Sequence, residues 1–226
     1  MVVISEKKQV VVPGDLLSED QSSAGDGTYV EDGKVYSLRY GVFEKVKGKL
    51  KVIPLSGKYI PSTGDVVIGK VIDINFSGWN TDINAPYYAF LRANEYFKRV
   101  DADELSRHLK IGDLILAKII QIDARMRIDL TLNEPSLRAL RSGRMVEIST
   151  TRIPRLIGRS GSMVNMLKRE LKCDILIGQN GRVWVDGTDE NVDLAIRTIV
   201  KVDEEAHTSG LTDRISEFIQ KGKEKK

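Results

Sequence analysis

The sequence has almost no cysteine or histidine. Cys173 is its one cysteine, and His108 and His207 are its two histidines. A single cysteine cannot close an intramolecular disulfide, which favours a cytoplasmic address. No cysteine and histidine spacing suits zinc, so we expect neither a metal nor another cofactor.

Long apolar runs and leader-like segments are also missing. No stretch approaches the 18 or so apolar residues that a membrane-spanning helix needs. Residues 1–12 carry charges where a secretory signal would be apolar. We therefore expect a soluble protein with no membrane partner.

The motifs of common catalytic sites are absent from the sequence as well. No Walker-type phosphate loop, nucleophile elbow or His-Glu-x-x-His sequence occurs. Carboxylate pairs such as Asp101/Asp103 and Glu204/Glu205 are expected by chance in a chain of which 30% is charged. The sequence therefore predicts a protein that is not an enzyme.

Positive charge is present and is concentrated in one segment. The whole chain of 226 residues has a net charge of only +3, but residues 144–172 hold seven basic residues against two acidic ones. A local excess of this kind attracts anions whatever the average charge.

The length of 226 residues predicts more than one domain.

The first 134 residues show the turns and the alternation of β structure. Residues 28–30 and 35–38 flank one turn, and 42–46 and 50–55 flank another, which predicts hairpins in an N-terminal β domain spanning 1–61. Five further runs predict a closed OB-type barrel across 62–134. These runs are 66–72, 78–83, 87–92, 114–123 and 126–132. The expected fold class is multidomain and mainly β.

From residue 143 onward the pattern becomes mixed. Apolar residues spaced by three and four predict two amphipathic helices. One spans 162–172, and the other follows Thr188, which is a good N-cap. The order β-α-α-β-β-α over 143–205 predicts an α+β domain. Residues 206–226 are expected to form a C-terminal helical extension, with a helix at 212–219 and a charged tail.

Two Gly-x-x-Gly loops occur in this α+β domain. The second, Gly178-Gln179-Asn180-Gly181, lies between two β-branched runs. Asn-Gly in that setting predicts a hairpin turn whose two central residues have positive φ. Gly178 would let another backbone approach closely, such as that of a neighbouring domain. We therefore assign Gly178, Asn180 and Gly181 a structural role.

The first loop, Gly158-Arg159-Ser160-Gly161, lies between two helices in the basic segment. Its glycines leave the backbone open to a sugar-phosphate chain; the alternative is a helix-helix turn that needs glycine only for its angles. The loop resembles that of a KH domain, which clamps about four nucleotides of single-stranded nucleic acid. The candidate RNA-binding residues here are Arg152, Gly158, Arg159, Ser160, Gly161 and Lys168.

The expected barrel resembles an S1 domain, which binds single strands through aromatic and basic side chains. Aromatic residues crowd it at Phe76, Trp79, Tyr87, Tyr88, Phe90, Tyr96 and Phe97. We expect at least half of them to fill the core. The candidate RNA contacts are Trp79, Tyr88, Phe90, Arg92, Lys98, Arg99, Arg125 and Arg127; for each basic residue, solvated surface charge is the alternative.

The chain as a whole resembles the archaeal exosome RNA-binding cap subunit of the ribosomal-RNA-processing-four type. Segments 59–69, 77–83 and 178–185 carry the resemblance together with the 158–161 loop. The resemblance implies a non-catalytic subunit, three copies of which cap a hexameric ring of RNase-PH-like subunits, with the N-terminal domain docked on the ring. It also implies more efficient RNA binding and 3′-to-5′ degradation, a preference for adenine-rich (poly(A)) RNA, and a structural Gly-x-Asn-Gly loop between the S1 and KH domains.

Two other functions stay open on the residues alone. One is an S1/KH regulator of transcription or translation outside the exosome, which would leave the N-terminal β domain unexplained. The other is a self-contained ribonuclease, which the missing catalytic motifs disfavour.

Overall fold

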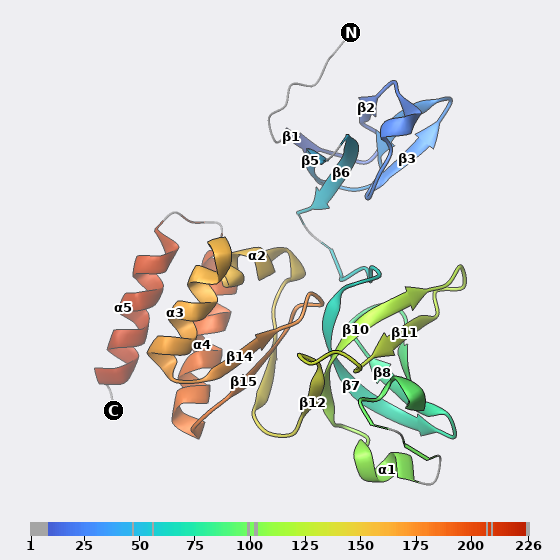
Figure 1. Cartoon of the computed structure of the whole chain (residues 1–226). Coiled ribbons are helices and arrows are strands. Elements are labelled where there is room, and N and C mark those ends of the chain that lie inside the picture. Colours follow the sequence, from blue (N-terminus) through green and yellow to red (C-terminus); the bar gives the residue numbers. More distant parts are fainter. Residues whose placement is uncertain are drawn as a thin grey trace. The chain divides into compact units, whose positions relative to one another are not determined.

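The chain forms two compact units. The computed structural model describes residues 9–46, 48–55, 57–98, 100–101, 104–206, 208 and 210–224. One unit extends to Gly57 and the other begins at Lys58 (Figure 1). We describe each unit by itself.

The N-terminal unit consists of two three-stranded antiparallel sheets with strand orders β1-β5-β6 and β2-β4-β3. Both predicted hairpins are confirmed, as β3/β4 and β5/β6. Its small core is aliphatic apart from Phe43. The strands are β1 Gln9–Val11, β2 Leu16–Ser18, β3 Thr28–Glu31, β4 Lys34–Ser37, β5 Gly41–Val46 and β6 Lys49–Pro54, with a 3-10 helix η1 at Gln21–Ser23.

The second unit begins with the predicted five-stranded barrel. Its strands follow the order β11-β9-β8-β7-β10, and pairing of β10 with β11 closes it. Burial alternates along β9, whereas β7 and β10 each bury three successive residues, and aliphatic side chains such as Val67, Leu91 and Ile119 fill the interior. The bounds are β7 Val66–Asn75, β8 Gly78–Asp82, β9 Ala89–Arg92, β10 Leu114–Ile122 and β11 Ile128–Thr131.

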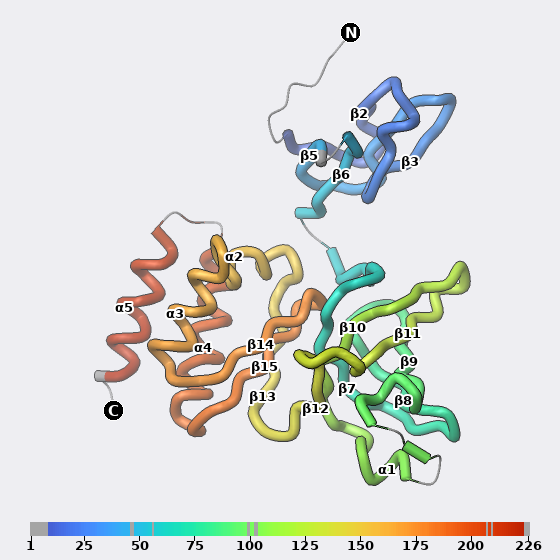
Figure 2. The backbone as a smooth tube through the Cα atoms, in the orientation of Figure 1, coloured from blue at the N-terminus to red at the C-terminus, as the bar shows by residue number. Residues whose placement is uncertain are grey.

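Short elements lie within the barrel segment and directly after it. A 3-10 helix η2 at Ala93–Glu95 and helix α1 at Leu105–His108 lie between β9 and β10. Strand β12, Arg138–Leu140, pairs with β10, and β13, Arg144–Glu147, starts the next sheet four residues later. Figure 2 follows this short passage from β12 into β13.

The α+β domain has the predicted order β-α-α-β-β-α. Its sheet has the order β13-β15-β14, and Figure 1 shows its helices on one side of β14 and β15 and the barrel on the other. Thr188 is the N-cap of α4, although its side chain forms no capping hydrogen bond. The remaining elements are η4 Thr150–Arg152, α2 Ile153–Ile157, η5 Arg159–Gly161, α3 Ser162–Leu171, β14 Asp174–Ile177, β15 Arg182–Asp186 and α4 Asp189–Glu205.

The C-terminal helix is longer than the sequence predicts. Helix α5 spans Leu211–Glu224 and packs against α4. Gly222 remains inside it, although glycine disfavours helices. A side chain there would lie against the Cδ1 and Cδ2 atoms of Leu194 in α4, so glycine permits the close contact between the two helices.

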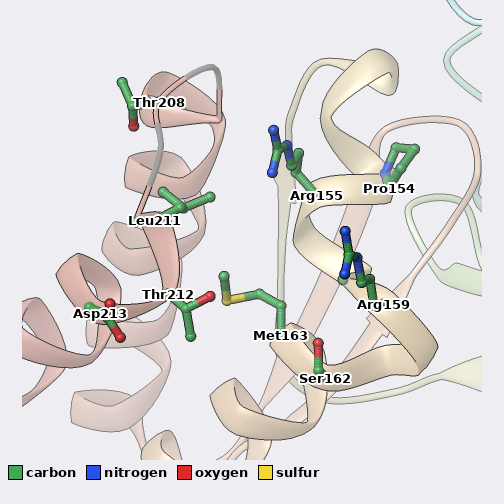
Figure 3. A pocket seen from close by; sticks show the side chains of 11 residues that line it. Pro154, Arg155, Arg159, Ser162, Met163, Thr208, Leu211, Thr212 and Asp213 are labelled. Carbon is green, nitrogen blue, oxygen red and sulfur yellow. The ribbon is translucent and has the colours of Figure 1, made fainter. Parts of the chain in front are cut away.

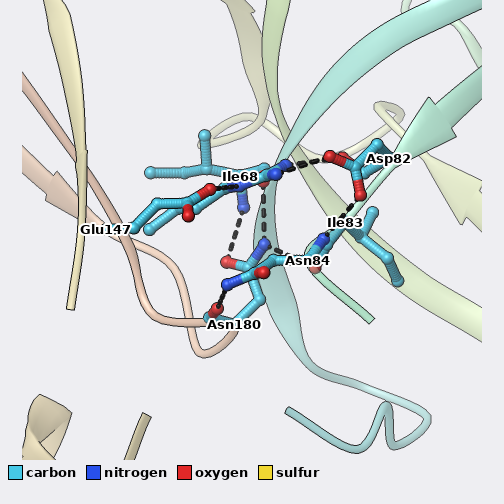
Figure 4. A network of polar contacts seen from close by, with 7 residues as sticks. Ile68, Asp82, Ile83, Asn84, Glu147 and Asn180 are labelled. Atoms are coloured by element: carbon cyan, nitrogen blue, oxygen red, sulfur yellow. Dashed lines mark hydrogen bonds and ion pairs between the residues drawn. The ribbon is translucent and has the colours of Figure 1, made fainter. Parts of the chain in front are cut away.

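The side chain of Asn180 joins the α+β domain to the barrel. It is fully buried, and its Oδ1 accepts a hydrogen bond from the Ile68 N–H at 3.2 Å. Its Nδ2 donates to the carbonyl oxygens of Ile68 and Ile83 at 2.8 and 2.9 Å (Figure 4). Gln179 adds a second connection, because its N–H donates to the Val66 carbonyl and its Oε1 accepts from the Val66 N–H.

Arg182 brings a buried charge to the same junction. Only 4% of the residue is exposed. Its guanidinium pairs with Asp82 of β8 at 2.6 Å and with Glu147 of β13 at 2.9 Å, and it also donates to the Asp82 carbonyl. Burial raises the pKa of Asp82, but the hydrogen bonds from Arg182 and from the Asn84 N–H outweigh burial and leave the pKa lowered. The buried cation is therefore paired, as burial requires.

The Gly-x-Asn-Gly hairpin is confirmed, but its turn differs from the predicted one. Gly181 has a φ of +82°, whereas Asn180 is not among the residues with positive φ. The Gly178 N–H donates to the Arg182 carbonyl across three loop residues, which is the geometry of a type I turn followed by a left-handed glycine. A Cβ at Gly178 would lie 2.8 Å from the Ile68 nitrogen, so the predicted close approach of another backbone is also confirmed.

Replacing Asn180 by alanine should destabilise the second unit. The Asn180→Ala variant leaves the buried Ile68 and Ile83 backbone groups without these bonds, and each unpaired buried group costs about 1–3 kcal/mol. We expect the free energy of unfolding, measured by urea denaturation, to fall by roughly 3 kcal/mol. The matched variant Asn94→Ala, at an exposed position, should change it by less than about 0.5 kcal/mol; equal losses for the two variants would contradict the structural role.

Candidate nucleic-acid interface

One face of the barrel carries aromatic and basic side chains along β9. Ala89 and Leu91 point into the core, whereas Phe90 is half-buried and Arg92 is exposed. Phe90 and Arg92 therefore lie on the same face of the strand. Strand β11 runs parallel to β9, with Asp129 opposite Phe90. The Arg92 guanidinium forms an ion pair with Asp129 at 3.1 Å, which offsets part of its charge.

Each end of this strand pair carries exposed aromatic rings. Tyr88 precedes β9 and is 68% exposed. Because Ile128 is opposite Ala89, the exposed Arg127 comes next to Tyr88 in the pairing. Arg125 is exposed in the turn before it. Tyr88 and Arg92 are four residues apart, or about 13 Å along a strand, so the surface can contact more than one nucleotide.

Phe76 is the most exposed aromatic residue of the barrel, and our candidate contacts omitted it. It lies in the turn between β7 and β8, and 87% of it is exposed. Gly78 is opposite Arg92 in the pairing of β8 with β9, so this turn lies at the Arg92 end of the strand pair. The sequence signal for this exposure is the position of Phe76 between the predicted strands 66–72 and 78–83, where no strand holds its ring on the inward face.

The prediction that Trp79 contacts RNA is wrong. Trp79 is fully buried, and its indole N–H donates to the Leu109 carbonyl at 3.3 Å. It fills the barrel beside Tyr96, the ring centroids being 5.4 Å apart. The expectation that at least half of the seven aromatic residues are core is also wrong, because only Trp79 and Tyr96 are buried. Branched aliphatic side chains fill the remaining volume.

Two other basic candidates lie after β9. Lys98 is exposed, and its ammonium group is 5.5 Å from the centroid of the Phe97 ring. Phe97 is itself 47% exposed, so this pair presents an apolar face and a cation together. Arg99 lies outside the residues that the structure describes.

The 158–161 loop has a left-handed backbone at three of its four positions. Gly158, Ser160 and Gly161 have φ values of +75°, +50° and +78°. Arg159 and Ser160 are both exposed. The loop therefore projects its two middle side chains into solvent, between the end of α2 and the start of α3.

The two glycines of this loop have different roles. A Cβ on Gly158 would lie 2.7 Å from the Met163 nitrogen and 2.9 Å from the Ser162 hydroxyl oxygen, so a side chain there would push the loop off α3. A Cβ on Gly161 would meet nothing closer than 3.4 Å. Gly158 is thus needed for packing as well as for its backbone angles, while Gly161 is needed for its angles alone.

The other two candidates of this domain lie apart from the loop. Arg152 ends the 3-10 helix η4 and is half-buried. Lys168 lies seven residues beyond Gly161, or about 10 Å along α3, and pairs with Asp174 at 3.1 Å. Arg155, which we counted in the basic segment but did not select, is exposed and shares a pocket with Arg159.

The described part of the chain holds neither a metal-binding cluster nor a membrane-spanning helix. Among those residues no group of three or more His, Cys, Asp or Glu side chains could hold a metal ion. In the same residues no helix has both the length and the apolar character that crossing a membrane requires.

Known domain families match all three parts of the chain. The N-terminal domain of the exosome RNA-binding protein RRP4 matches residues 8–56, the S1 domain of RRP4 matches 58–121, and a KH domain matches 143–191. These matches confirm the predicted fold class.

Curated relatives match almost the full length. An exosome complex component Rrp4 from Methanosarcina acetivorans is 46% identical over 213 residues, covering 94% of this chain and 82% of the relative. The protein of the same name from Methanothermus fervidus is 43% identical over 215 residues, covering 95% of this chain and 96% of the relative. A crystal structure described provisionally as an exosome complex RNA-binding protein is 36% identical, with a TM-score of 0.69, and covers 74% of this chain and 98% of its own.

Removing the Phe76 ring should weaken binding of single-stranded RNA. Stacking of one base on an aromatic ring is worth about 1–3 kcal/mol, so Phe76→Ala should raise the Kd about tenfold in a fluorescence anisotropy titration. Ile111→Ala is the control, because Ile111 is 66% exposed on the same barrel but is not aromatic. The barrel assignment fails if both variants bind RNA as the wild type does.

We call residues 158–161 the clamp loop. A negative charge on this loop should weaken RNA binding without unfolding the domain. Aspartate tolerates the left-handed backbone of Ser160, and Ser160→Asp places a carboxylate where a phosphate is expected. We expect the Kd to rise about fivefold to tenfold. Ser160→Asn has nearly the same shape and no charge, and should bind within twofold of wild type. An equal effect of the two variants would show that loop shape, not charge, controls binding.

Proposed function

The chain belongs to the Rrp4 family of exosome complex components, and from this we propose that it is a non-catalytic RNA-binding subunit of an exosome. In this role it increases RNA binding and 3′-to-5′ degradation by catalytic subunits on other polypeptides. The observation that carries the proposal is that two candidate RNA-binding surfaces of different kinds, on the barrel and on the clamp loop, belong to one compact unit.

The barrel surface supports RNA of many sequences. Exposed rings at Phe76 and Tyr88 can stack on any base, because every base has a π-face. The exposed Arg125 and Arg127 can pair with phosphates, which carry no sequence information. The clamp loop adds a backbone-directed contact with Arg159 at its centre. Together these features suit a subunit that handles diverse RNA strands and passes them on.

The N-terminal unit supplies a surface for docking to an exosome subunit. In the β1-β5-β6 sheet Val10, Val42 and Ile53 are cross-strand neighbours. Val10 is 54% exposed and Ile53 is 40% exposed, whereas the opposite face of the sheet packs into the core. Exposed aliphatic side chains aligned across three strands favour a protein partner. Because this unit matches a domain of an exosome protein, we assign the surface to a ring subunit of that complex.

The assembly that we propose follows the family resemblance in its details. Three copies of this chain cap a hexameric ring of RNase-PH-like subunits in the cytoplasm. The barrels surround the RNA entry, and adenine-rich RNA is preferred. The paired rings and cations of the barrel are compatible with adenine, which has a large stacking surface.

Reconstitution tests this function and the docking surface together. The full chain should co-elute with ring subunits from its own cell and should speed the degradation of a labelled RNA by the ring, more strongly for an adenine-rich RNA than for a uracil-rich one. Failure to associate with the ring would overturn the proposal, and so would RNA trimming by the isolated chain, because trimming would place catalysis in this polypeptide.

Charged residues in the aliphatic surface should prevent docking. We expect Val10→Asp combined with Ile53→Asp to abolish co-elution with the ring while RNA binding by the free chain remains within twofold of wild type. Val30→Asp is the matched control, since Val30 is 45% exposed on β3 of the other sheet. Loss of co-elution in the control alone would place the interface on the other sheet.

A further inference from the structure

A pocket of about 670 Å³ lies between the clamp loop and the C-terminal helix. One wall consists of residues of α2, the loop and the start of α3, among them Arg155, Arg159 and Met163. The other wall consists of Thr208 and the first turn of α5. Figure 3 shows the arginines on one wall and Leu211, Thr212 and Asp213 on the other. The volume is within the range of about 300–1,000 Å³ that is usual for small-ligand sites.

The wall that carries the clamp loop is basic. Arg155 and Arg159 are both exposed, and neither forms an ion pair with any residue in the described part of the chain. Arg155 lies on α2 and Arg159 lies beyond the helix break at Gly158, and both line this wall. Each guanidinium group can bind phosphate oxygens through two parallel hydrogen bonds. This wall therefore suits a phosphate group.

The apolar and hydroxyl residues of the two walls suit the rest of a nucleotide. Met163 on one wall and Leu211 on the other are 5% and 6% exposed and supply apolar side chains. Ser162 and Thr212 are exposed hydroxyl residues on opposite walls. The Thr208 hydroxyl is already used, because it donates to the Glu205 carbonyl at 2.7 Å. Asp213 is the one carboxylate among the lining residues.

The two glycine loops of the α+β domain face different parts of the structure. The 178–181 loop is occupied by its contacts with the barrel, with Asn180 fully buried. Helix α5 instead faces the clamp loop across a pocket, and α5 lies beyond the segment 143–191 that matches the KH family.

We infer that this pocket binds one nucleotide of single-stranded RNA, with its phosphate between Arg155 and Arg159 and its base on Met163 and Leu211. The inference rests on the proposed RNA-binding function and gives the C-terminal helix a part in it. The clamp loop supplies one side of the nucleotide site and α5 the other.

The test uses the full-length chain and a fluorescent single-stranded RNA. Thr212→Glu places a negative charge in the pocket from the α5 side, and an acidic residue in a first helical turn does not disfavour the helix. We expect its Kd for RNA to rise about fivefold to tenfold. Gln220→Glu adds the same charge to an exposed position of α5 outside the pocket and should bind within twofold of wild type.

A second pair of variants tests the opposite wall. Arg155→Ala should raise the Kd about fivefold and should reduce the slope of log Kd against log salt by about one, as expected when one phosphate contact is lost. Arg197→Ala removes an exposed arginine of α4 outside the pocket and should leave both quantities unchanged.

The outcomes separate this inference from the proposed function. If the wild-type chain binds no RNA, the RNA-binding function itself is wrong. If the wild type binds RNA and Thr212→Glu and Arg155→Ala bind equally well, the pocket is not part of the RNA site. Adenosine 5′-monophosphate distinguishes the source of the nucleotide: if it shifts the NMR signals of residues 210–213 and RNA does not, the pocket serves a free nucleotide and the inference is overturned.

Discussion

The hydrogen bonds of the buried Asn180 side chain hold the barrel and the α+β domain together. One amide group satisfies three backbone groups of β7 and of the residue after β8, all in the interior of the junction. Because unpaired buried backbone groups are costly, the two domains cannot separate here without losing stability. Arg182 reinforces the junction, since its buried charge is balanced by one carboxylate from each domain.

The same junction explains why two similar glycine loops do different work. The 178–181 loop places its asparagine and its arginine neighbour inside the protein, where they make the interdomain contacts. The two middle residues of the 158–161 loop, Arg159 and Ser160, are instead exposed to solvent. Glycine thus serves close backbone approach in one loop and left-handed geometry with an open surface in the other.

Much of the fold could be predicted from local patterns. Alternation in 126–132 predicted β11, apolar spacing in 162–172 predicted α3, and Asn-Gly predicted the β14–β15 hairpin. The turn type was not predictable, because Asn180 takes the conformation that lets its side chain reach another domain more than 90 residues away in the sequence. The length of α5 was missed for a similar reason, since Gly222 is favoured by contact with α4.

The candidate site was less predictable than the fold. The aromatic content of the barrel could be read from the sequence. The sequence did not distinguish Trp79, which is buried in the core, from Phe76, which is exposed. That difference depends on whether a residue lies in a strand facing inward or in a turn. The pocket beside the clamp loop was hidden because its walls are separated by about 50 residues of sequence and meet only when α5 packs on the domain.

The junction between the barrel and the α+β domain determines how long an RNA strand must be to contact both surfaces at once. On the RNA-binding function proposed above, a strand held at the barrel meets the clamp loop within the same complex, at an effective concentration set by the distance between the two surfaces. A strand too short to span that distance can use only one surface at a time. A longer strand gains the avidity of both surfaces without any new contact. The junction at Asn180 therefore sets the strand length above which the affinity for RNA rises.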